Sequence, residues 1–167
     1  SQQLEIGSVA SLSAPIDLRV EYMPTPALGI TELKPRFSFA LATAQVFSGA
    51  GLPRGTAQSA FQLRVWETVS NTTVWDSGAV KSGKSYGIEF GSGQHPAAKS
   101  LKAETAYSWQ VSWSNDGREW SPATQAAFEV GLVNETDWGG AQWVGGQDQK
   151  QFRVAFDILA GATTSAP

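Results

Sequence analysis

Residues 106–114, AYSWQVSWS, alternate between large apolar and small polar side chains along their whole length. The members of one parity are Tyr107, Trp109, Val111 and Trp113, and those of the other are Ser108, Gln110 and Ser112. Successive side chains of a β-strand point to opposite faces of the sheet. The segment therefore predicts a strand with an aromatic wall toward a core and small polar groups on its outer side.

Other segments show the same strand-like character, and turn-forming sequences separate them. The expected strands are residues 16–22, 36–42, 60–67, 74–77, 86–90 and 126–130, and the breakers between strands include PTPALG, SGAGLPRG, SGKS, GSGQHPAA and NDG. Helical periodicity is nearly missing, and no P-loop or GxGxxG pattern occurs. About seven short antiparallel strands of this kind are typical of a two-sheet β-sandwich.

A local motif indicates which sandwich this is. Leu101, Thr105 and Tyr107 resemble the Leu-x-x-x-Thr-x-Tyr segment of fibronectin type III domains, in which the tyrosine hydroxyl bonds backbone a few residues upstream. Ala103 stands where those domains commonly carry proline. Trp109 and Trp75 are expected in the core. We therefore predict a fibronectin type III or immunoglobulin-like β-sandwich, followed by one extra carboxyl-terminal strand.

The expected organisation has five parts. They are an extended segment at 1–15, the sandwich at 16–132, a Gly- and Trp-rich connector at 133–150, a lone strand at 151–159 and a flexible tail at 160–167. In the lone strand Phe152, Val154, Phe156 and Ile158 share a face. A seven-strand sandwich does not need this segment, so it begins another domain or pairs with another chain.

Charge and composition exclude several functions. The formal net charge is −3, and no basic stripe exists that would neutralise phosphates or anionic lipid, so neither nucleic acid nor a membrane is an expected partner. The chain has no cysteine, and its one histidine, His95, has no partners for a metal site or a catalytic triad. No cofactor and no metal are expected.

Two sequons bear on localisation. Asn71-Thr72-Thr73 and Asn134-Glu135-Thr136 both fit the N-glycosylation acceptor pattern. In a chain rich in serine and threonine and free of thiols, they favour a secreted protein, with Asn71 and Asn134 as candidate glycan sites.

Six blocks in order resemble the amino-terminal module of bacterial and fungal α-L-rhamnosidases. They are Leu18-Arg19-x-Glu21-Tyr22 with Leu28-Gly29-Ile30 and Pro35-Arg36-Phe37-Ser38; Gln58-x-Ala60-Phe61-Gln62; Trp75-Asp76-Ser77-Gly78-x-Val80-x-Ser82; AYSWQVSWSNDGREWSPATQAAFEVGL; DWGGAQWVGG; and FRVAFDI. The resemblance covers residues 16–158. The departures, Ala27 and the longer TAQVFSGAGLPRG, fall in loops, where insertions are tolerated.

The resemblance implies a fold and a parent enzyme, and it transfers no catalytic residue. In that family a separate (α/α)₆ barrel supplies the acid and base carboxylates, and this chain holds no segment that could form one. Its own acidic residues are dispersed, whereas glycoside hydrolysis needs two carboxyl groups across a sugar. We therefore expect a non-catalytic module of an α-L-rhamnosidase-like glycoside hydrolase, whose partners are adjacent domains of the same polypeptide.

Two alternatives remain open at this stage. The chain could be a structural subunit that forms a glycosylated filament of its own copies by exchanging the strand of Phe152, Val154, Phe156 and Ile158. It could instead be a carbohydrate-binding module, because aromatic faces stack on sugar rings. Trp66, Trp113 and Trp120 are the tryptophans expected to be exposed, whereas Trp138 and Trp143 are expected to pack against whatever follows the sandwich.

Overall fold

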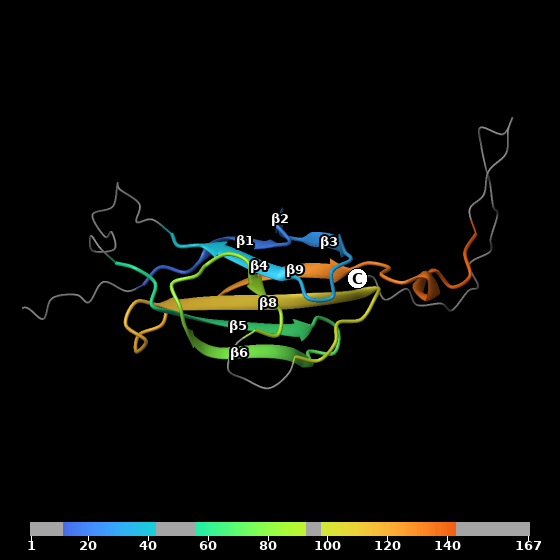
Figure 1. The fold of residues 1–167 in the computed structure, drawn as a ribbon. Coiled ribbons are helices and arrows are strands. Elements are labelled where there is room, and N and C mark those ends of the chain that lie inside the picture. Colours follow the sequence, from blue (N-terminus) through green and yellow to red (C-terminus); the bar gives the residue numbers. More distant parts are fainter. Residues whose placement is uncertain (1–11, 43–55, 93–97, 143–167) are drawn as a thin grey trace, which may run out of the picture.

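The computed structural model describes residues 12–42, 56–92 and 98–142. Within them the chain forms nine β-strands and one short 3₁₀ helix: β1 (Ile16–Val20), β2 (Met23–Pro24), β3 (Ala27–Ile30), β4 (Arg36–Ala40), β5 (Ala60–Glu67), β6 (Thr73–Lys81), β7 (Ile88–Glu89), β8 (Thr105–Ser114), β9 (Thr124–Val130) and η1 (Glu135–Trp138). They build two sheets, ordered β2-β1-β4-β7 and β3-β9-β8-β5-β6 (Figure 1). The predicted β-sandwich is confirmed.

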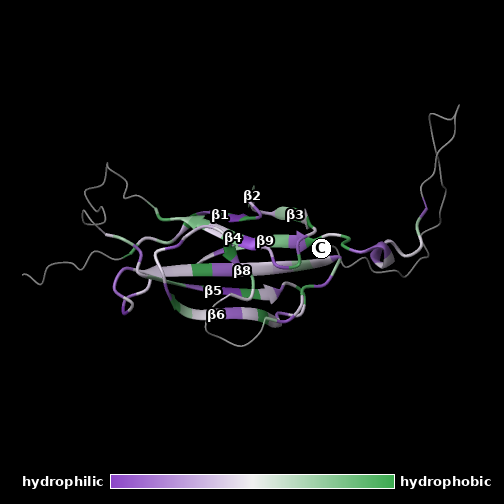
Figure 2. Cartoon of the chain, viewed as in Figure 1, coloured by the Kyte–Doolittle hydropathy of each residue, from purple (hydrophilic) through white to green (hydrophobic). Residues whose placement is uncertain are grey.

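The core lies between the sheets and is built around the inner face of β8. Tyr107, Trp109, Val111 and Trp113 are all buried there. From the opposite sheet the Phe37 ring meets Trp109 with ring centroids 4.8 Å apart, and Tyr107 stacks on Phe128 at 5.3 Å. Figure 2 shows the hydrophobic and hydrophilic residues interleaved along the strands, as expected when each strand has one face in the core.

The tyrosine corner lies at the start of β8. The Tyr107 hydroxyl accepts a hydrogen bond from the Lys102 backbone N–H at 2.9 Å, and the Thr105 hydroxyl donates to the Ala103 carbonyl at 2.9 Å. Leu101 is buried beside them. These bonds hold the approach to β8 although Ala103 replaces the usual proline.

The Trp-Asp-Ser-Gly block forms a bulge in the edge strand β6. Trp75 points into the core, while Asp76 Oδ1 accepts from the Gly78 N–H at 2.8 Å. Ser77 Oγ accepts from the Leu63 N–H at 2.9 Å, so it replaces a missing ladder bond from β5. Gly78 has a φ of 57°, which a residue with a Cβ adopts only with strain. Each residue of the block therefore has a separate structural task.

The segment PTPALG differs from the prediction. It was expected as a plain turn between two strands, but it contains β2 and β3, and β3 crosses to the other sheet and pairs with β9 in parallel. The all-antiparallel expectation is therefore wrong for this pair. Ala27 and Ile30 drive the crossover because both side chains are buried. Thr25 secures it, since its hydroxyl contacts both the carbonyl and the N–H of Ala127.

Several predicted parts lie outside the described residues. They are the lone strand at 151–159 with Phe152, Val154, Phe156 and Ile158, the tail at 160–167, residues 1–11 of the amino-terminal segment, His95 and Trp143. The connector is described only as far as residue 142, and it contains η1.

Candidate functional site

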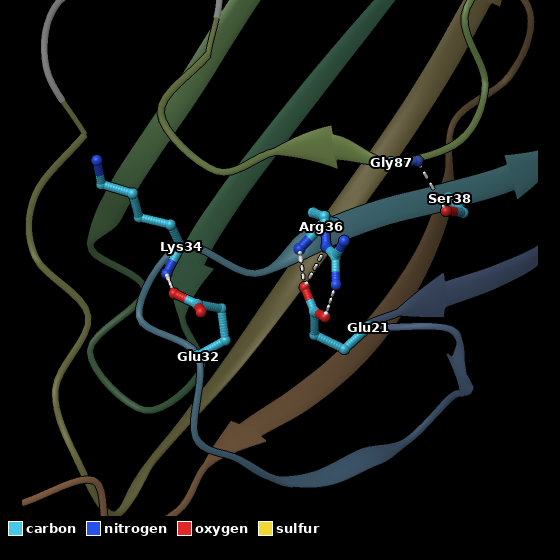
Figure 3. Close-up of polar contacts among 6 residues, drawn as sticks. All are labelled: Glu21, Glu32, Lys34, Arg36, Ser38 and Gly87. Carbon is cyan, nitrogen blue, oxygen red and sulfur yellow. Dashed lines mark hydrogen bonds and ion pairs between the residues drawn. The ribbon is translucent and has the colours of Figure 1, made fainter.

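Glu21 and Arg36 form a polar cluster on the surface of the described part of the chain. Glu21 follows β1 and Arg36 begins β4, so the two residues lie side by side although 15 positions separate them in the sequence. The Arg36 Nη2 lies 2.7 Å from Glu21 Oε2 and its Nε lies 3.1 Å from Oε1. The Arg36 backbone N–H also donates to Oε1, at 2.6 Å (Figure 3). One carboxylate therefore binds the arginine through its side chain and its main chain.

The charges of this pair stabilise each other. The Arg36 guanidinium, through its hydrogen bonds, holds the pKa of Glu21 below its usual range, and partial burial opposes that shift. The same contacts raise the pKa of Arg36. The guanidinium carbon also lies 5.3 Å from the ring centroid of Tyr22, whose side chain is exposed. A carboxylate held in its ionised form by arginine is a poor general acid, so the cluster is suited to fixing a surface rather than to proton transfer.

Neighbouring polar contacts fix the adjoining backbone. The Lys34 N–H donates to Glu32 Oε1 at 2.8 Å, and the Gly87 N–H donates to Ser38 Oγ at 3.1 Å (Figure 3). They join the loop before β4, β4 itself and the segment before β7. In the sequence, Glu21 and Arg36 stand only as residues of the family signature. Opposite charges at the facing ends of two neighbouring predicted strands were the signal that could have identified the pair.

Trp113 is the one predicted exposed aromatic that the structure contradicts. Its side chain is 0% exposed, and its indole Nε1 donates to the Ser13 carbonyl at 2.8 Å. The segment before β1 covers this end of β8, so Trp113 has no face on which a sugar could stack. The periodicity of β8 had already placed it on the inner side.

The other tryptophans divide by environment. Trp75 and Trp109 are buried in the core. Trp66 lies half-buried on the outer face of β5, with the Arg64 guanidinium carbon 5.9 Å from its ring centroid. Trp120 lies half-buried in the turn between β8 and β9. Trp138 ends η1 and is 54% exposed, so within the described residues the partner expected for it is not seen.

The connector leaves β9 as a capped turn. Asp137 Oδ2 accepts from the backbone N–H groups of Val133 and Asn134 at 2.9 and 2.8 Å. These hydrogen bonds hold the pKa of Asp137 below its usual range. The turn then ends at Gly139, whose φ is 58°. Hydrogen bonds therefore hold the backbone that carries Trp138, at the end of the sandwich where β9 finishes.

Both sequon asparagines lie on the surface. Asn71 is exposed in the turn between β5 and β6, with a φ of 53°, and Asn134 is exposed immediately before η1. Among the described residues, no other element covers either side chain.

The exposed sheet edges limit strand addition. Among the described strands, β2 and β7 at the edges of the smaller sheet have two residues each. In the larger sheet the edge strands are β3, with four residues, and β6. The strand β6 carries the Gly78 bulge, and its Val74 carbonyl already accepts from the Lys99 N–H at 2.8 Å. Short and bulged edges are common protections against pairing with other chains. Exchange through residues 152–158 lies outside the described part and stays a prediction.

Among the described residues, the acidic groups with shifted pKa values hold parts of the fold in place. The carboxyl groups whose pKa departs from its usual value, Glu21, Asp116 and Asp137, are all shifted downward, in each case chiefly by hydrogen bonds to the ionised form. Within residues 12–42, 56–92 and 98–142, no three side chains of His, Asp or Glu come together as metal ligands. In the same residues no helix has the length and apolar character needed to cross a bilayer.

The comparisons with known proteins agree on one family. Residues 15–134 match the family model described as Rha78A-like, N-terminal immunoglobulin domain. A curated protein of Formosa agariphila named alpha-L-rhamnosidase is 33% identical over 125 residues, which is 71% of this chain and 12% of that protein. Another from the same organism and with the same name is 31% identical over 96 residues, or 54% of this chain and 10% of that protein.

Solved structures give the same picture. An alpha-L-rhamnosidase from Dictyoglumus thermophilum superposes with a TM-score of 0.62 at 28% identity, over 78% of this chain and 14% of its own. The Streptomyces avermitilis alpha-L-rhamnosidase complexed with L-rhamnose gives 0.61 at 30% identity, over 75% of this chain and 11% of its own. The chain thus spans only 10–12% of the length of the curated relatives that it matches.

Proposed function

The chain belongs to the family of Rha78A-like N-terminal immunoglobulin domains, and we propose that it is the non-catalytic amino-terminal module of a secreted α-L-rhamnosidase-like glycoside hydrolase. In that role it packs against the neighbouring domains of a longer polypeptide and holds the catalytic assembly in position. The observation that carries the proposal is the match of nearly the whole sandwich to a small share of relatives named alpha-L-rhamnosidase.

The disposition of charged groups supports a structural role. Glycoside hydrolysis requires one carboxyl group with a raised pKa and a second one across the sugar. Glu21, Asp116 and Asp137 instead have lowered pKa values. Asp116 and Asp137 each accept a hydrogen bond from a backbone N–H three residues away. Glu21 accepts one from the backbone N–H of Arg36, at the start of β4. These hydrogen bonds hold surface loops in one conformation, which suits a module that must present a fixed shape to its neighbours.

The direction of the chain supports a contact at one particular end. β9 finishes at Val130, and the backbone of Gly131 bonds the Ile30 carbonyl at 2.9 Å before η1 begins. Exposed Trp138 then lies on the way to the rest of the connector. A domain attached after this connector reaches this end of the sandwich first, because the short tether keeps its local concentration high.

Secretion and glycosylation are part of the proposal. Both Asn71 and Asn134 are exposed, so passage through a eukaryotic secretory pathway should add a glycan to each. The check is the mass of the secreted protein before and after endoglycosidase treatment, compared with Asn71→Gln and Asn134→Gln. Equal masses before and after treatment would contradict this part.

The functional test compares the chain with the longer polypeptide that contains it. We expect the 167-residue chain to leave an aryl α-L-rhamnoside uncleaved, and the longer polypeptide to cleave it. Deleting residues 16–132 from the longer form should lower its thermal midpoint and its activity together. Hydrolysis by the isolated chain would reject the proposal. An unchanged thermal midpoint and unchanged activity of the longer form after the deletion would reject it too. A native polypeptide no larger than 17.8 kDa would favour the self-assembling subunit instead.

A further inference from the structure

A hollow at the far end of the sandwich from η1 has the composition of a small sugar site. Leu12, Glu119, Trp120, Ser121 and Pro122 line it, and its volume is about 530 Å³. It lies beside the turn between β8 and β9, whereas Thr105 and Val130, paired at the other end of these strands, lie near η1. We propose that this hollow binds one uncharged pyranose unit, with Trp120 as the stacking platform and Glu119 as the hydrogen-bond acceptor.

One wall of the hollow is a turn that the protein holds rigidly. Asp116 Oδ1 accepts from the N–H groups of Arg118 and Glu119 at 2.7 and 3.0 Å. Ser114 Oγ accepts from the Gly117 N–H at 2.8 Å, and Gly117 has a φ of 76°, which favours glycine. The backbone that carries Glu119 and Trp120 is thereby fixed before any ligand arrives, which lowers the entropy lost on binding.

The segment before β1 also lines the hollow through Leu12, and two hydrogen bonds hold it in place. The Ser13 carbonyl accepts from Trp113 Nε1 at 2.8 Å, and the Pro15 carbonyl accepts from the Thr124 hydroxyl at 2.6 Å. Leu12 packs into the core cluster at the start of this segment. The same contacts that bury Trp113 therefore hold Leu12 in place, and Leu12 lines the hollow together with Trp120.

The lining chemistry selects the class of ligand. Small-molecule sites are mostly apolar, with a few polar groups that fix orientation. Trp120, Leu12 and Pro122 make the lining largely apolar, and an indole face can pack on the C–H face of a sugar ring. Ser121 Oγ is already engaged, because it accepts from the Trp113 N–H and donates to the Pro122 carbonyl.

Glu119 supplies the free polar group. Its side chain is exposed and has no hydrogen-bond or ion partner among the described residues. An ionised carboxylate only accepts hydrogen bonds, so it suits the vicinal hydroxyls of a sugar. It also repels a uronate or a phosphate, and Asp116, which the turn keeps ionised, adds to that repulsion.

Trp66 is the natural comparison. It is also half-buried, but it lies on a sheet face rather than in a hollow, and Arg64 covers one side of its ring. It serves as the matched control, because replacing it removes an aromatic surface of the same size without touching the hollow.

The test follows the indole and backbone N–H signals of the 167-residue chain by ¹H–¹⁵N NMR during titration with methyl α-L-rhamnopyranoside, a neutral pyranoside chosen because the relatives are named rhamnosidases. The backbone N–H signal of residue 119, beside the hollow, reports binding in the variant that lacks the Trp120 indole. We expect a saturable shift of the Trp120 signal, and no shift with glucuronate. Trp120→Ala should weaken binding about tenfold or more, Glu119→Gln about threefold to tenfold, and Trp66→Ala not at all. Unchanged signals of the core tryptophans show that each variant is folded.

The outcomes separate this inference from the proposed function, because the readout does not involve hydrolysis or a neighbouring domain. A linear, unsaturable shift, a response centred on Trp66, or full binding by both Trp120→Ala and Glu119→Gln would overturn the sugar site. Each of these results leaves the role as an amino-terminal module unaffected.

Discussion

The carboxylate of Glu21 binds Arg36 through three hydrogen bonds, two from the guanidinium and one from the Arg36 backbone N–H. This single side chain therefore connects the end of β1 to the start of β4 and sets the position of Tyr22 against the guanidinium. The family signature Leu-Arg-x-Glu-Tyr and Pro-Arg-Phe-Ser thus corresponds to one physical contact. The contribution of this contact to the free energy of unfolding can be measured.

Glu21→Gln keeps the shape of the side chain and removes its charge. We expect the free energy of unfolding to fall by about 0.5–1 kcal/mol, because the pair is partly exposed and such pairs are worth little individually. Urea denaturation followed by tryptophan fluorescence measures the change. Glu129→Gln is the control, since Glu129 is exposed on β9 and its side chain has no hydrogen-bond or ion partner among the described residues. An equal loss in both variants would contradict a specific role for the contact.

Stability should decline at acid pH in a defined direction. Arginine and backbone donors hold the pKa of Glu21 below its ordinary 4.5, and backbone donors hold those of Asp116 and Asp137 below 3.8. A folded-state pKa below the unfolded one gives stability that is present above the unfolded pKa and is lost as the pH falls through the folded one. The thermal midpoint should therefore stay level down to about pH 5 and fall below about pH 4.

Glu21→Gln provides the internal check on that decline. Because the amide does not titrate, the variant should lose less stability than the parent chain between about pH 5 and about pH 3. Thermal scans of the two proteins across that range decide the point. Identical slopes would show that Glu21 does not contribute to acid unfolding.

Tyr107→Phe removes the hydroxyl that accepts from the Lys102 N–H. A backbone donor would be left without its partner, so we expect a loss of about 1–2 kcal/mol in the free energy of unfolding. Tyr86→Phe is the matched control, because the Tyr86 side chain is 69% exposed. Chemical denaturation of the two variants should separate them clearly, and equal stabilities would show that the corner bond is dispensable.

Trp113→Ala and Trp138→Ala test the opposite environments of two tryptophans. The first leaves a cavity at the end of β8 and removes the bond to Ser13, so we expect a loss of about 3–5 kcal/mol or failure to fold. The second removes an exposed ring and should change stability by less than about 0.5 kcal/mol. Should Trp113→Phe, which keeps much of the volume, also unfold the chain, the bond to Ser13 would outweigh the packing.

The local patterns predicted the strands well where one face is buried along the whole element. Residues 106–114 coincide with β8 to within one residue, and residues 60–67 coincide with β5. The tyrosine corner could be predicted too, because its partners lie within six positions of one another in the sequence. Alternation of this length has only one packing solution against a second sheet.

Contacts between distant segments could not be predicted in the same way. Residues 24–29 are rich in turn-forming residues. The segment forms the parallel strand β3 because Ala27 and Ile30 become buried when it pairs with β9. The alternation of β8 indicated that Trp113 faces inward, but no local pattern showed that the Ser13 carbonyl accepts from its indole N–H. The hollow beside Trp120 depends on that same long-range contact.

Taken by itself, the sequence determined the sandwich, the boundaries of its longest strands and its family, because alternation, turn residues and ordered signature blocks are local properties of the chain. Only the tertiary structure decided which aromatic rings face solvent, that Glu21 contacts Arg36, and that the crossover strand β3 pairs with β9. Those features arise when segments tens to a hundred residues apart bury surface against each other, and no local periodicity encodes which of them will meet.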